Sequence, residues 1–545
     1  NSNWSNRNTA KAFATYNKLL GEDHEFKVIA GGDYEEYEYW FHSSQRRNLI
    51  DPNMGELDLA TGDQYVDGSR DKWRNLGFFG RINYSFQNKF LLELNGRYDG
   101  ASRLSAEEKW AFFPSFSAGY VLTEEDYMDF ADPYLSFLKI RGSWGELGNP
   151  NAGLGNIYRI MDPYNSGWII DGTNKVTVGT PPAQPASLTW ETVTTLDLGV
   201  DARFFQNRLG LSFDWYERVV SDMHSAGVTL PSSFGTGAPK RNFGELTTTG
   251  FEIAADFKHS FDNGLNISAT ATLTDYQEEI TKFANTTMRI YGNYEGKMLG
   301  EIWGYETDRL FQESDFNADG SPVAGTPSQE LYENSWFQYG PGDVKYRDLN
   351  GDGVINYGTE TVGDSGDMKV IGNTTPRWQY GFRIAADWKG FDLSVFMQGV
   401  GKRDMWANGP VVIPGYRYNE GWYAHQLDYW SPENTDAFYP RPTDQSQSNT
   451  IRNFMPQSRY LQDMSYLRMK NLTVGYSLPG SLTESLGINQ FRVYFSGENL
   501  FEWDNLDMPL DPEVDYTTAG LNDPNTFGRV YPFRRNLSFG VQVSL

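Results

Sequence analysis

The sequence predicts an all-β protein: a large antiparallel β-barrel that spans a membrane. Three observations predict it. Apolar and polar residues alternate with period two in segment after segment, tight turns and long loops follow one another in order, and no run of about 18 apolar residues could form a spanning helix. Successive side chains of a strand point to opposite faces, so only every second residue of a barrel strand meets lipid. A soluble β-sandwich strand also alternates, but the number of repeats favours the barrel.

The C-terminal segment shows the alternation most cleanly. Apolar residues stand at every odd position from Leu537 to Leu545, and small or polar residues stand between them, so we expect the odd positions to face lipid. By this pattern we count about fifteen strands. Other segments that alternate in the same way are residues 82–86, 90–94, 196–204, 209–215, 251–257, 265–271, 380–388, 391–397, 472–478 and 491–495.

The connections between these segments fall into two classes. Tight turns stand at residues 87–89, 206–208, 262–264 and 389–390, whereas roughly 40 to 100 residues separate other strands, as in 279–376. Short turns on the periplasmic side and long loops outside the cell are typical of barrels in the Gram-negative outer membrane. We interpret 279–376 as a long extracellular loop region inside the barrel domain, because its Pro-, Gly- and Asp-rich composition favours a loop over a packed core.

Composition narrows the class of function. The chain has 46 Lys and Arg against 71 Asp and Glu, a net charge of −25, which argues against nucleic acid as a partner. It has no cysteine, so disulfides and Cys-bound metals are excluded. Its 33 Tyr, 35 Phe and 16 Trp would suit aromatic girdles at the two membrane interfaces.

The odd number of expected strands indicates that the barrel is incomplete. The last strand should end in the periplasm, so the first strand, near residues 12–16, should start outside the cell. A closed barrel of this type has an even number of strands with both termini inside. We therefore expect residues 1–545 to be one partial barrel domain, with the first strands upstream.

Several motifs, in order along the chain, resemble the SusC-like TonB-dependent transporters of the outer membrane. They run from about residue 11 to residue 545, and their number and order make the match specific. The motifs are Gly80-Arg81-Ile82-Asn83-Tyr84, Arg97-Tyr98-Asp99-Gly100-Ala101-Ser102-Arg103, Leu138-Lys139-Ile140-Arg141-Gly142-Ser143-Trp144-Gly145, Pro341-Gly342-Asp343-Val344-Lys345-Tyr346-Arg347-Asp348-Leu349-Asn350-Gly351-Asp352-Gly353, Gly497-Glu498-Asn499-Leu500-Phe501 and Asp511-Pro512-Glu513.

The resemblance implies a function. It implies a barrel of about 22 strands, with a plug domain and a TonB box that this sequence lacks. It also implies active import of oligomeric nutrients, glycan or peptide, with a SusD-like surface lipoprotein as partner. Energy would come from TonB–ExbB–ExbD through the upstream region, and outer-membrane lipids and lipopolysaccharide would surround the barrel. A passive porin-like channel and a structural or secretion-associated barrel are the alternatives.

One motif in the long loop region resembles a calcium loop. Oxygen-bearing side chains of Asp348, Asn350, Asp352 and Asn356, with the carbonyl of Val354, stand at the spacing of an EF-hand loop. The bidentate Glu belongs where Thr359 stands, and Glu360 follows one residue late. The candidate metal ligands are therefore Asp348, Asn350, Asp352, Val354, Asn356 and Glu360, for a Ca²⁺ that would stiffen the loop. The alternative is a Gly-rich polar turn without a metal. No cofactor is required.

A second loop is dense in aromatic residues. Sugar faces stack on flat rings, so the candidate substrate-binding residues are Trp406, Tyr416, Tyr418, Trp422 and Tyr423. A membrane-edge girdle, or packing against a partner lid, would use the same residues.

On the strands, Arg97, Arg141 and Arg203 should face the lumen, where they could hold acids of a plug domain or pair with neighbouring barrel acids. We expect the pairing. The five His are scattered, and no nucleophile elbow, Walker loop or HExxH motif is present, so we predict that the protein is not an enzyme.

Overall fold

The computed structural model describes residues 1–105, 107–150, 163–179, 188–225, 231–235, 238–239, 241–335, 337–416, 421–443, 452–483, 487–516, 530–531 and 533–545. One antiparallel sheet of 18 strands dominates it. Three of these strands are short pieces, β13 (Lys297–Met298), β20 (Asp404–Trp406) and β23 (Glu502–Asn505), which leaves fifteen long strands.

The long strands are β1 (Ser2–Leu20), β2 (His24–Arg46), β3 (Gln64–Phe86), β4 (Phe90–Ala101), β5 (Trp110–Val121), β6 (Leu135–Asn149), β9 (Glu191–Phe204), β10 (Leu209–Ser225), β11 (Arg241–Ser260), β12 (Asn266–Lys282), β18 (Arg377–Trp388), β19 (Phe391–Lys402), β21 (Leu461–Ser477), β22 (Gln490–Glu498) and β24 (Asn536–Ser544).

Smaller elements lie in the connections. Three two-stranded sheets pair β7 (Pro163–Ile170) with β8 (Thr173–Val178), β14 (Glu301–Tyr305) with β17 (Met368–Asn373), and β15 (Thr307–Leu310) with β16 (Val344–Tyr346). The helices are α2 (Gly480–Thr483) and the 3-10 turns η1 (Leu57–Leu59), η2 (Leu122–Glu124), η3 (Asp126–Ala131), η4 (Ser232–Phe234), η5 (Glu313–Asp315), η6 (Glu330–Tyr332) and η7 (Ala424–Leu427). Within the described ranges, no helix has the length and apolarity needed to cross a membrane.

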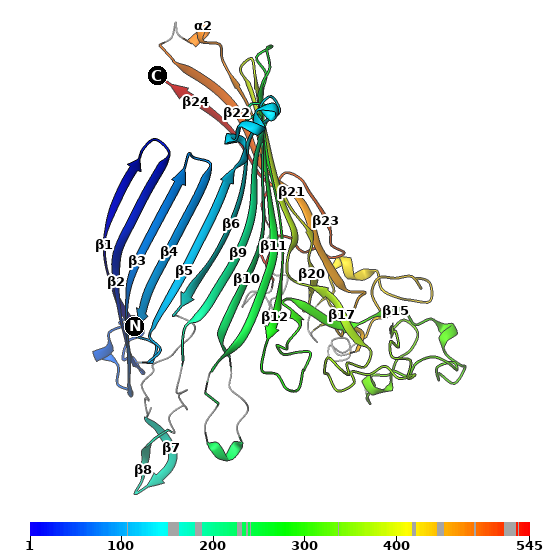
Figure 1. The fold of residues 1–545 in the computed structure, drawn as a ribbon. Coiled ribbons are helices and arrows are strands. Elements are labelled where there is room, and N and C mark those ends of the chain that lie inside the picture. Colours follow the sequence, from blue (N-terminus) through cyan, green and yellow to red (C-terminus); the bar gives the residue numbers. More distant parts are fainter. Residues whose placement is uncertain are drawn as a thin grey trace.

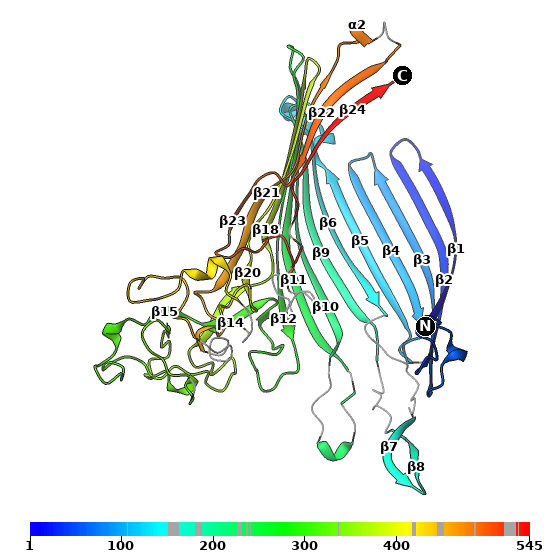
Figure 2. The same cartoon turned by 180° about the vertical axis from the view of Figure 1, so that it is seen from behind.

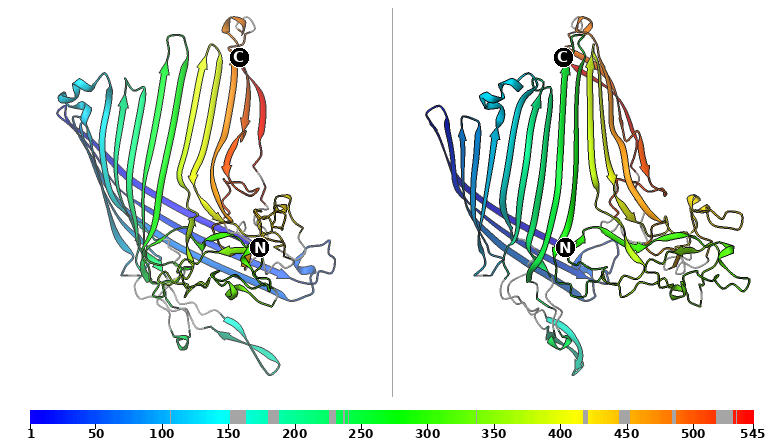
Figure 3. Two further views of the ribbon diagram at one scale, coloured as in Figure 1. Left: turned by 90° about the vertical axis from the view of Figure 1, so that its right-hand side faces the viewer. Right: turned by 45° about the vertical axis from the view of Figure 1, so that its right-hand side comes forward.

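Each long strand pairs antiparallel with the long strand that follows it in sequence, from β1–β2 to β22–β24. No pairing joins β1 to β24 among the described residues, and the two strands lie apart in Figures 1 and 2. The sheet curves strongly along its width (Figure 3). The predicted all-β class and the count of about fifteen barrel strands are confirmed. The total of about 22 strands, and the partial nature of the barrel, stay predictions.

The two classes of connection lie at opposite edges of the sheet. The tight turns and the C-terminus share one edge, and the long loops and the N-terminus share the other (Figure 1). The turns use left-handed backbone, at Gly21 (φ +66°), Asn88 (φ +56°) and Gly264 (φ +83°), where Gly and Asn are the residues that accept this conformation most readily. The predicted segregation of tight turns and long loops is confirmed, and the periplasmic and extracellular sides of the two edges stay predictions.

The sheet has one apolar and one polar face. Directly paired residues share a face, so a chain of partners such as Ile82, Leu94, Phe116 and Trp144 marks the apolar face across four strands. Its side chains are uncovered: Leu198 is 49% exposed and Phe116 is also 49% exposed. A continuous uncovered apolar surface of this extent requires lipid as its solvent.

The C-terminal strand follows the same rule. Phe539 and Val541 pair with Phe495 and Val493 on the apolar face, whereas Gln542 pairs with Arg492 on the polar face. Exposure alone does not separate the two faces of β24, because both are open at the end of the sheet. The strand register supports the predicted lipid-facing odd positions.

Candidate functional site

The polar face of the sheet is organised by ion pairs that bridge three strands. Arg97 on β4 reaches Asp33 on β2, with 3.0 Å between Nη2 and Oδ1. Gly77 on β3 lies directly between them, and a Cβ there would come within 2.6 Å of the guanidinium. The middle strand therefore carries a glycine because any side chain would displace the ion pair.

This arrangement, which we call a glycine-bridged ion pair, occurs four times among the described residues. In every case the Asp on one outer strand is a direct register partner of the glycine, and the Arg on the other outer strand is the second register partner or lies two residues from it. The Arg and the Asp come within 3.0 Å of each other. The four are Arg97–Gly77–Asp33, Arg141–Gly199–Asp214, Arg203–Gly210–Asp256 and Arg492–Gly475–Asp392. The predicted pairing of Arg97, Arg141 and Arg203 with barrel acids is confirmed.

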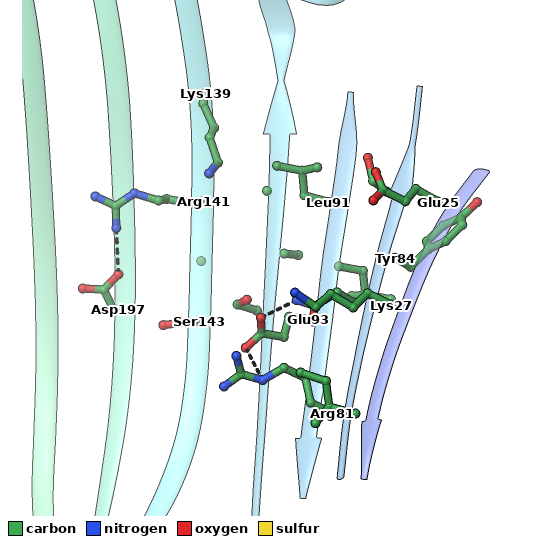
Figure 4. A pocket seen from close by; sticks show the side chains of 18 residues that line it. Glu25, Lys27, Arg81, Tyr84, Leu91, Glu93, Lys139, Arg141, Ser143 and Asp197 are labelled. Carbon is green, nitrogen blue, oxygen red and sulfur yellow. Dashed lines mark hydrogen bonds and ion pairs between the residues drawn. The ribbon is translucent and has the colours of Figure 1, made fainter. Parts of the chain in front are cut away.

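A groove of about 680 Å³ opens on this polar face over β2 to β9 (Figure 4). Arg81 pairs with Glu93 at 3.6 Å and Arg141 with Asp197 at 3.4 Å along its wall. Lys27 and Lys139 also line the groove, and neither forms an ion pair with any residue that the structure describes. The groove thus offers free cations in a polar, water-accessible wall, a surface suited to a polar solute or to an acidic protein segment.

A second groove, of about 540 Å³, lies beside the first, toward the loop edge. Its floor is the ring of Phe79, which Lys11 approaches at 5.1 Å and Arg97 at 5.5 Å. Phe13 and Phe113 also line it. Cations held over an aromatic floor can contact both charged and apolar parts of a ligand.

At the loop edge, segments from three long connections pack into one body, which we call the loop body (residues 283–376, 403–460 and 506–516, where described). Its core is fully buried: Val344 and Tyr460 are 0% exposed. The core residues contributed by the three connections include Tyr305, Val344, Tyr346, Ile355, Val412, Ile413, Trp430, Tyr439, Tyr460, Met508 and Tyr516. The expectation that 279–376 would favour a loop over a packed core is wrong, because the stretch supplies buried residues to a core that it shares with two distant segments.

Buried polar groups join the parts of the loop body. The carboxylate of Asp343, 0% exposed, accepts hydrogen bonds from Nε of Arg441 and Nδ2 of Asn453, both at 2.9 Å, and from the backbone N–H of Gly340. Gln457 donates to the carbonyl of Asn453 at 2.6 Å. Both oxygens of the buried Asp343 carboxylate are thus hydrogen-bonded, as burial of a charge requires.

The third connection is held to the barrel wall by charge. Arg468 on β21, whose side chain is 3% exposed, binds Asp511 at 2.9 Å and also contacts Glu513. Lys470 binds Glu513 at 2.7 Å, and Arg403 binds Asp515 at 2.9 Å. Residues 506–516 are therefore tied both to the wall and, through Met508 and Tyr516, to the core of the loop body.

The predicted calcium loop closes on its own backbone. The Asp348 carboxylate accepts N–H bonds from Gly351 (2.6 Å) and Gly353 (2.8 Å), and Asp352 accepts one from Val354 (2.8 Å). The amide of Asn356 donates to Asp352 and to the carbonyl of Val354, while Asn350 donates to Asp352.

Glu360 belongs to the next turn, where its carbonyl accepts a hydrogen bond from the N–H of Ile290. The described residues hold no group of three or more His, Cys, Asp or Glu that could hold a metal. Any cation would therefore rely on amide and carbonyl oxygens as well. Calcium at this loop stays a prediction.

The predicted aromatic residues divide between two environments. Trp406 and Tyr416 are partly buried and pack against the core of the loop body. Trp422 meets Tyr429 edge to face at 5.6 Å, and Tyr423 is 37% exposed. Tyr418 lies outside the described residues. Packing thus uses two of these rings, and their role in substrate contact stays a prediction.

Sequence reasoning missed the glycines of the bridged ion pairs and the buried Asp343. The glycines could have been found only with the strand register, since Gly199 and Arg141 are far apart in sequence. Asp343 lies within one of the motifs that carry the family resemblance, but no pattern in the neighbouring sequence indicates that it is buried.

The family model for the TonB dependent receptor-like β-barrel matches residues 1–500. Among curated relatives, the TonB-dependent receptor P3 of Formosa agariphila is 27% identical over 97% of this chain and 51% of its own length. The TonB-dependent receptor SusC of Bacteroides thetaiotaomicron is 25% identical over 96% of this chain and 49% of its own length. The latter match confirms the resemblance to SusC-like proteins, and the chain spans about half the length of these relatives.

Among solved structures, the RagAB peptide transporter matches the fold with a TM-score of 0.75 at 21% identity, over 99% of this chain and 55% of that chain. The chain therefore belongs to the TonB-dependent receptor-like β-barrel family and is an integral protein of the Gram-negative outer membrane.

Proposed function

We propose that the protein imports oligomeric nutrients, glycan or peptide, across the outer membrane, with energy from TonB. The observation that carries the proposal is the amphipathic wall. Its apolar face meets lipid, and its opposite face carries bridged ion pairs and two polar grooves that only an aqueous lumen would suit. Family membership and the SusC and RagAB matches support import over other uses of a barrel.

The same comparisons support a proposal for the partners. The matched RagAB structure is described as a peptide transporter, and SusC as a TonB-dependent receptor. We infer that this barrel works with a SusD-like surface lipoprotein, which would meet the loop edge, and with TonB–ExbB–ExbD, which would act through an upstream plug. Free Lys27 and Lys139 in the first groove would face such a plug.

A passive porin-like channel and a structural or secretion-associated barrel are the competing functions. A passive channel would let solute through without TonB. A structural barrel would transport nothing under any condition.

The test is uptake by cells that carry the full-length receptor. Labelled maltoheptaose and a labelled decapeptide serve as probes, in cells with and without TonB. We expect uptake of at least one probe that depends on TonB and on the upstream region. Equal uptake with and without TonB would support the passive channel, and equal solute flux through liposomes whether or not the upstream region is present would exclude a plug.

We further propose that Ca²⁺ binds the loop of Asp348, Asn350, Asp352 and Asn356. Each carboxylate oxygen of Asp348 accepts one backbone N–H bond, which leaves it a second lone pair for a cation. Thermal unfolding of the full-length receptor is measured in CaCl₂ and in EGTA. A raised Tm in CaCl₂ that Asp348→Asn with Asp352→Asn abolishes supports the site, and an unchanged Tm in the wild type overturns it.

A further inference from the structure

Strands β1, β2 and β3 are much longer than a membrane requires. They have 19, 23 and 23 residues, whereas about 9 to 11 tilted residues cross the hydrocarbon. On β3 the apolar face runs from Phe86 at the turn edge to Leu76, through Tyr84, Ile82 and Phe78. The rest of β3, up to Gln64, must therefore project beyond the outer boundary of the lipid tails.

Beyond Leu76 the same outward face changes to charge. The next three residues on that face of β3 are Arg74, Lys72 and Arg70. Their register partners on β2 are Glu36, Glu38 and Trp40, and Trp40 pairs in turn with Trp4 on β1. We call these seven positions, from Leu76 outward, the outer ladder: Arg70, Lys72, Arg74, Glu36, Glu38, Trp40 and Trp4.

The cations of the outer ladder cover its carboxylates. Lys72 lies 3.4 Å from Glu36 and also contacts Glu38, Arg70 lies 3.3 Å from Glu38, and Arg74 contacts Glu36. The side chains of Arg70 and Arg74 are 57% and 55% exposed, whereas those of Glu36 and Glu38 are only 16% and 15% exposed. The surface that the ladder presents outward is thus cationic, on a chain whose net charge is −25.

The far end of the ladder is aromatic. Trp4 and Trp40 stack with ring centroids 4.3 Å apart, and the Arg70 guanidinium lies 4.6 Å from the Trp40 ring. The register places both indole rings on the outward face of the ladder. Flat rings of this kind pack against the apolar faces of sugars.

We propose that the outer ladder binds the phosphorylated sugar headgroup of an outer-leaflet glycolipid of the lipid A type. Its acyl chains would lie against the apolar face below Leu76, its phosphates against Arg74, Lys72 and Arg70, and its sugars toward the Trp4–Trp40 stack. Phosphate suits Arg, whose forked donors match it. The proposal rests on the outer-membrane location alone and is independent of import.

An acidic protein partner could also meet a cationic surface. Continuity favours the lipid: the ladder lies on the same face, on the same three strands, as the side chains that contact acyl chains, and it begins one register step beyond them. A protein partner at this height would have to displace the glycolipids that surround the barrel. The geometry therefore matches a ligand that is apolar at one end and anionic at the other.

The experiment measures lipid A bound to the full-length receptor in detergent micelles by native mass spectrometry. Bisphosphorylated lipid A and its dephosphorylated form are the probes. The test variant is Arg70→Gln with Arg74→Gln. The matched control is Lys18→Gln with Lys389→Gln, which removes two exposed cations near the turn edge. A third variant, Arg70→Lys with Arg74→Lys, keeps the charge and shows whether loss of binding reflects charge or misfolding.

We expect the wild type, the control and the Lys variant to retain bisphosphorylated lipid A. We expect the Gln variant to bind it roughly thirty-fold more weakly, from two lost cations near a membrane surface. Dephosphorylated lipid A should bind all variants weakly. Equal binding by the Gln variant and the wild type, or equal binding of the two lipids, would overturn the proposal. Retained binding in the Lys variant ties the loss in the Gln variant to the removed charges.

Discussion

The barrel wall and the loop body belong to one chain, but they place their apolar side chains in opposite ways. In the wall, large apolar side chains such as Leu198 and Phe116 are both 49% exposed, and charged residues face one another across glycines on the opposite face. In the loop body, apolar residues such as Val344 are 0% exposed, as in a water-soluble domain. Lipid stabilises the first pattern and water the second, so exposure has opposite meanings in the two regions.

Asp343→Ala should produce the largest effect and confine it to the loop body. The change leaves Arg441 and Asn453 without their buried partner, which costs about 3 to 5 kcal/mol. Hydrogen exchange of the full-length receptor should show residues 283–376 and 403–443 losing protection while the wall keeps it. Asp308→Ala, at a 39% exposed side chain, is the control and should change little. Equal loss of protection in the wall would mean that the two regions are one cooperative unit.

Leu198→Arg tests the meaning of exposure in the wall. In a soluble protein, a charge at a half-exposed position changes little, but on a lipid face near the middle of the bilayer it costs about 2 to 4 kcal/mol. Unfolding in lipid vesicles, followed by gel mobility, measures it. Ser117→Arg, on the polar face near Glu93, should have a much smaller effect. If Leu198→Arg is the more stable of the two, the faces are assigned the wrong way round.

Gly199→Ala tests the glycine-bridged ion pairs. Its Cβ would come 2.6 Å from both the Arg141 guanidinium and Oδ1 of Asp214, so the pair must move aside, at about 1 to 2 kcal/mol. Gly381→Ala is the matched control, since its nearest neighbour would be 3.5 Å away. The same vesicle unfolding assay applies, and indistinguishable stabilities for the two variants would show that the bridge needs no glycine.

Acid should weaken the loop body by a smaller amount through Asp315. Hydrogen bonds from Arg309 lower the pKa of Asp315 to about 2. A carboxyl whose folded pKa lies below its unfolded value contributes stability above about pH 4 and loses it as the pH falls through 2. We expect about 1 kcal/mol after solvent screening. Local hydrogen exchange at pH 5 and pH 2.5 should differ in the wild type and not in Asp315→Asn.

The sequence predicted the wall far better than the loop body, for a physical reason. Alternation is local: residues 537–545 carry their face assignment within nine positions. The core of the loop body joins Tyr346, Tyr460 and Tyr516, which no local period connects. The ion pairs could be predicted only in part. Arg141 was correctly placed on the polar face, but its partner Asp214 and the glycine between them required the register of three strands.

One measurement tests the two-faced wall most directly. This chain has no cysteine, so single Cys residues can be placed at each position from 196 to 201 on β9 of the full-length receptor and spin-labelled in vesicles. Collision with oxygen reports lipid, and collision with a water-soluble nickel complex reports the lumen. We predict that labels at positions 196, 198 and 200 meet oxygen and that labels at 197, 199 and 201 meet nickel. The reverse alternation, or no alternation, would contradict a barrel with lipid on its apolar face and water on its charged one.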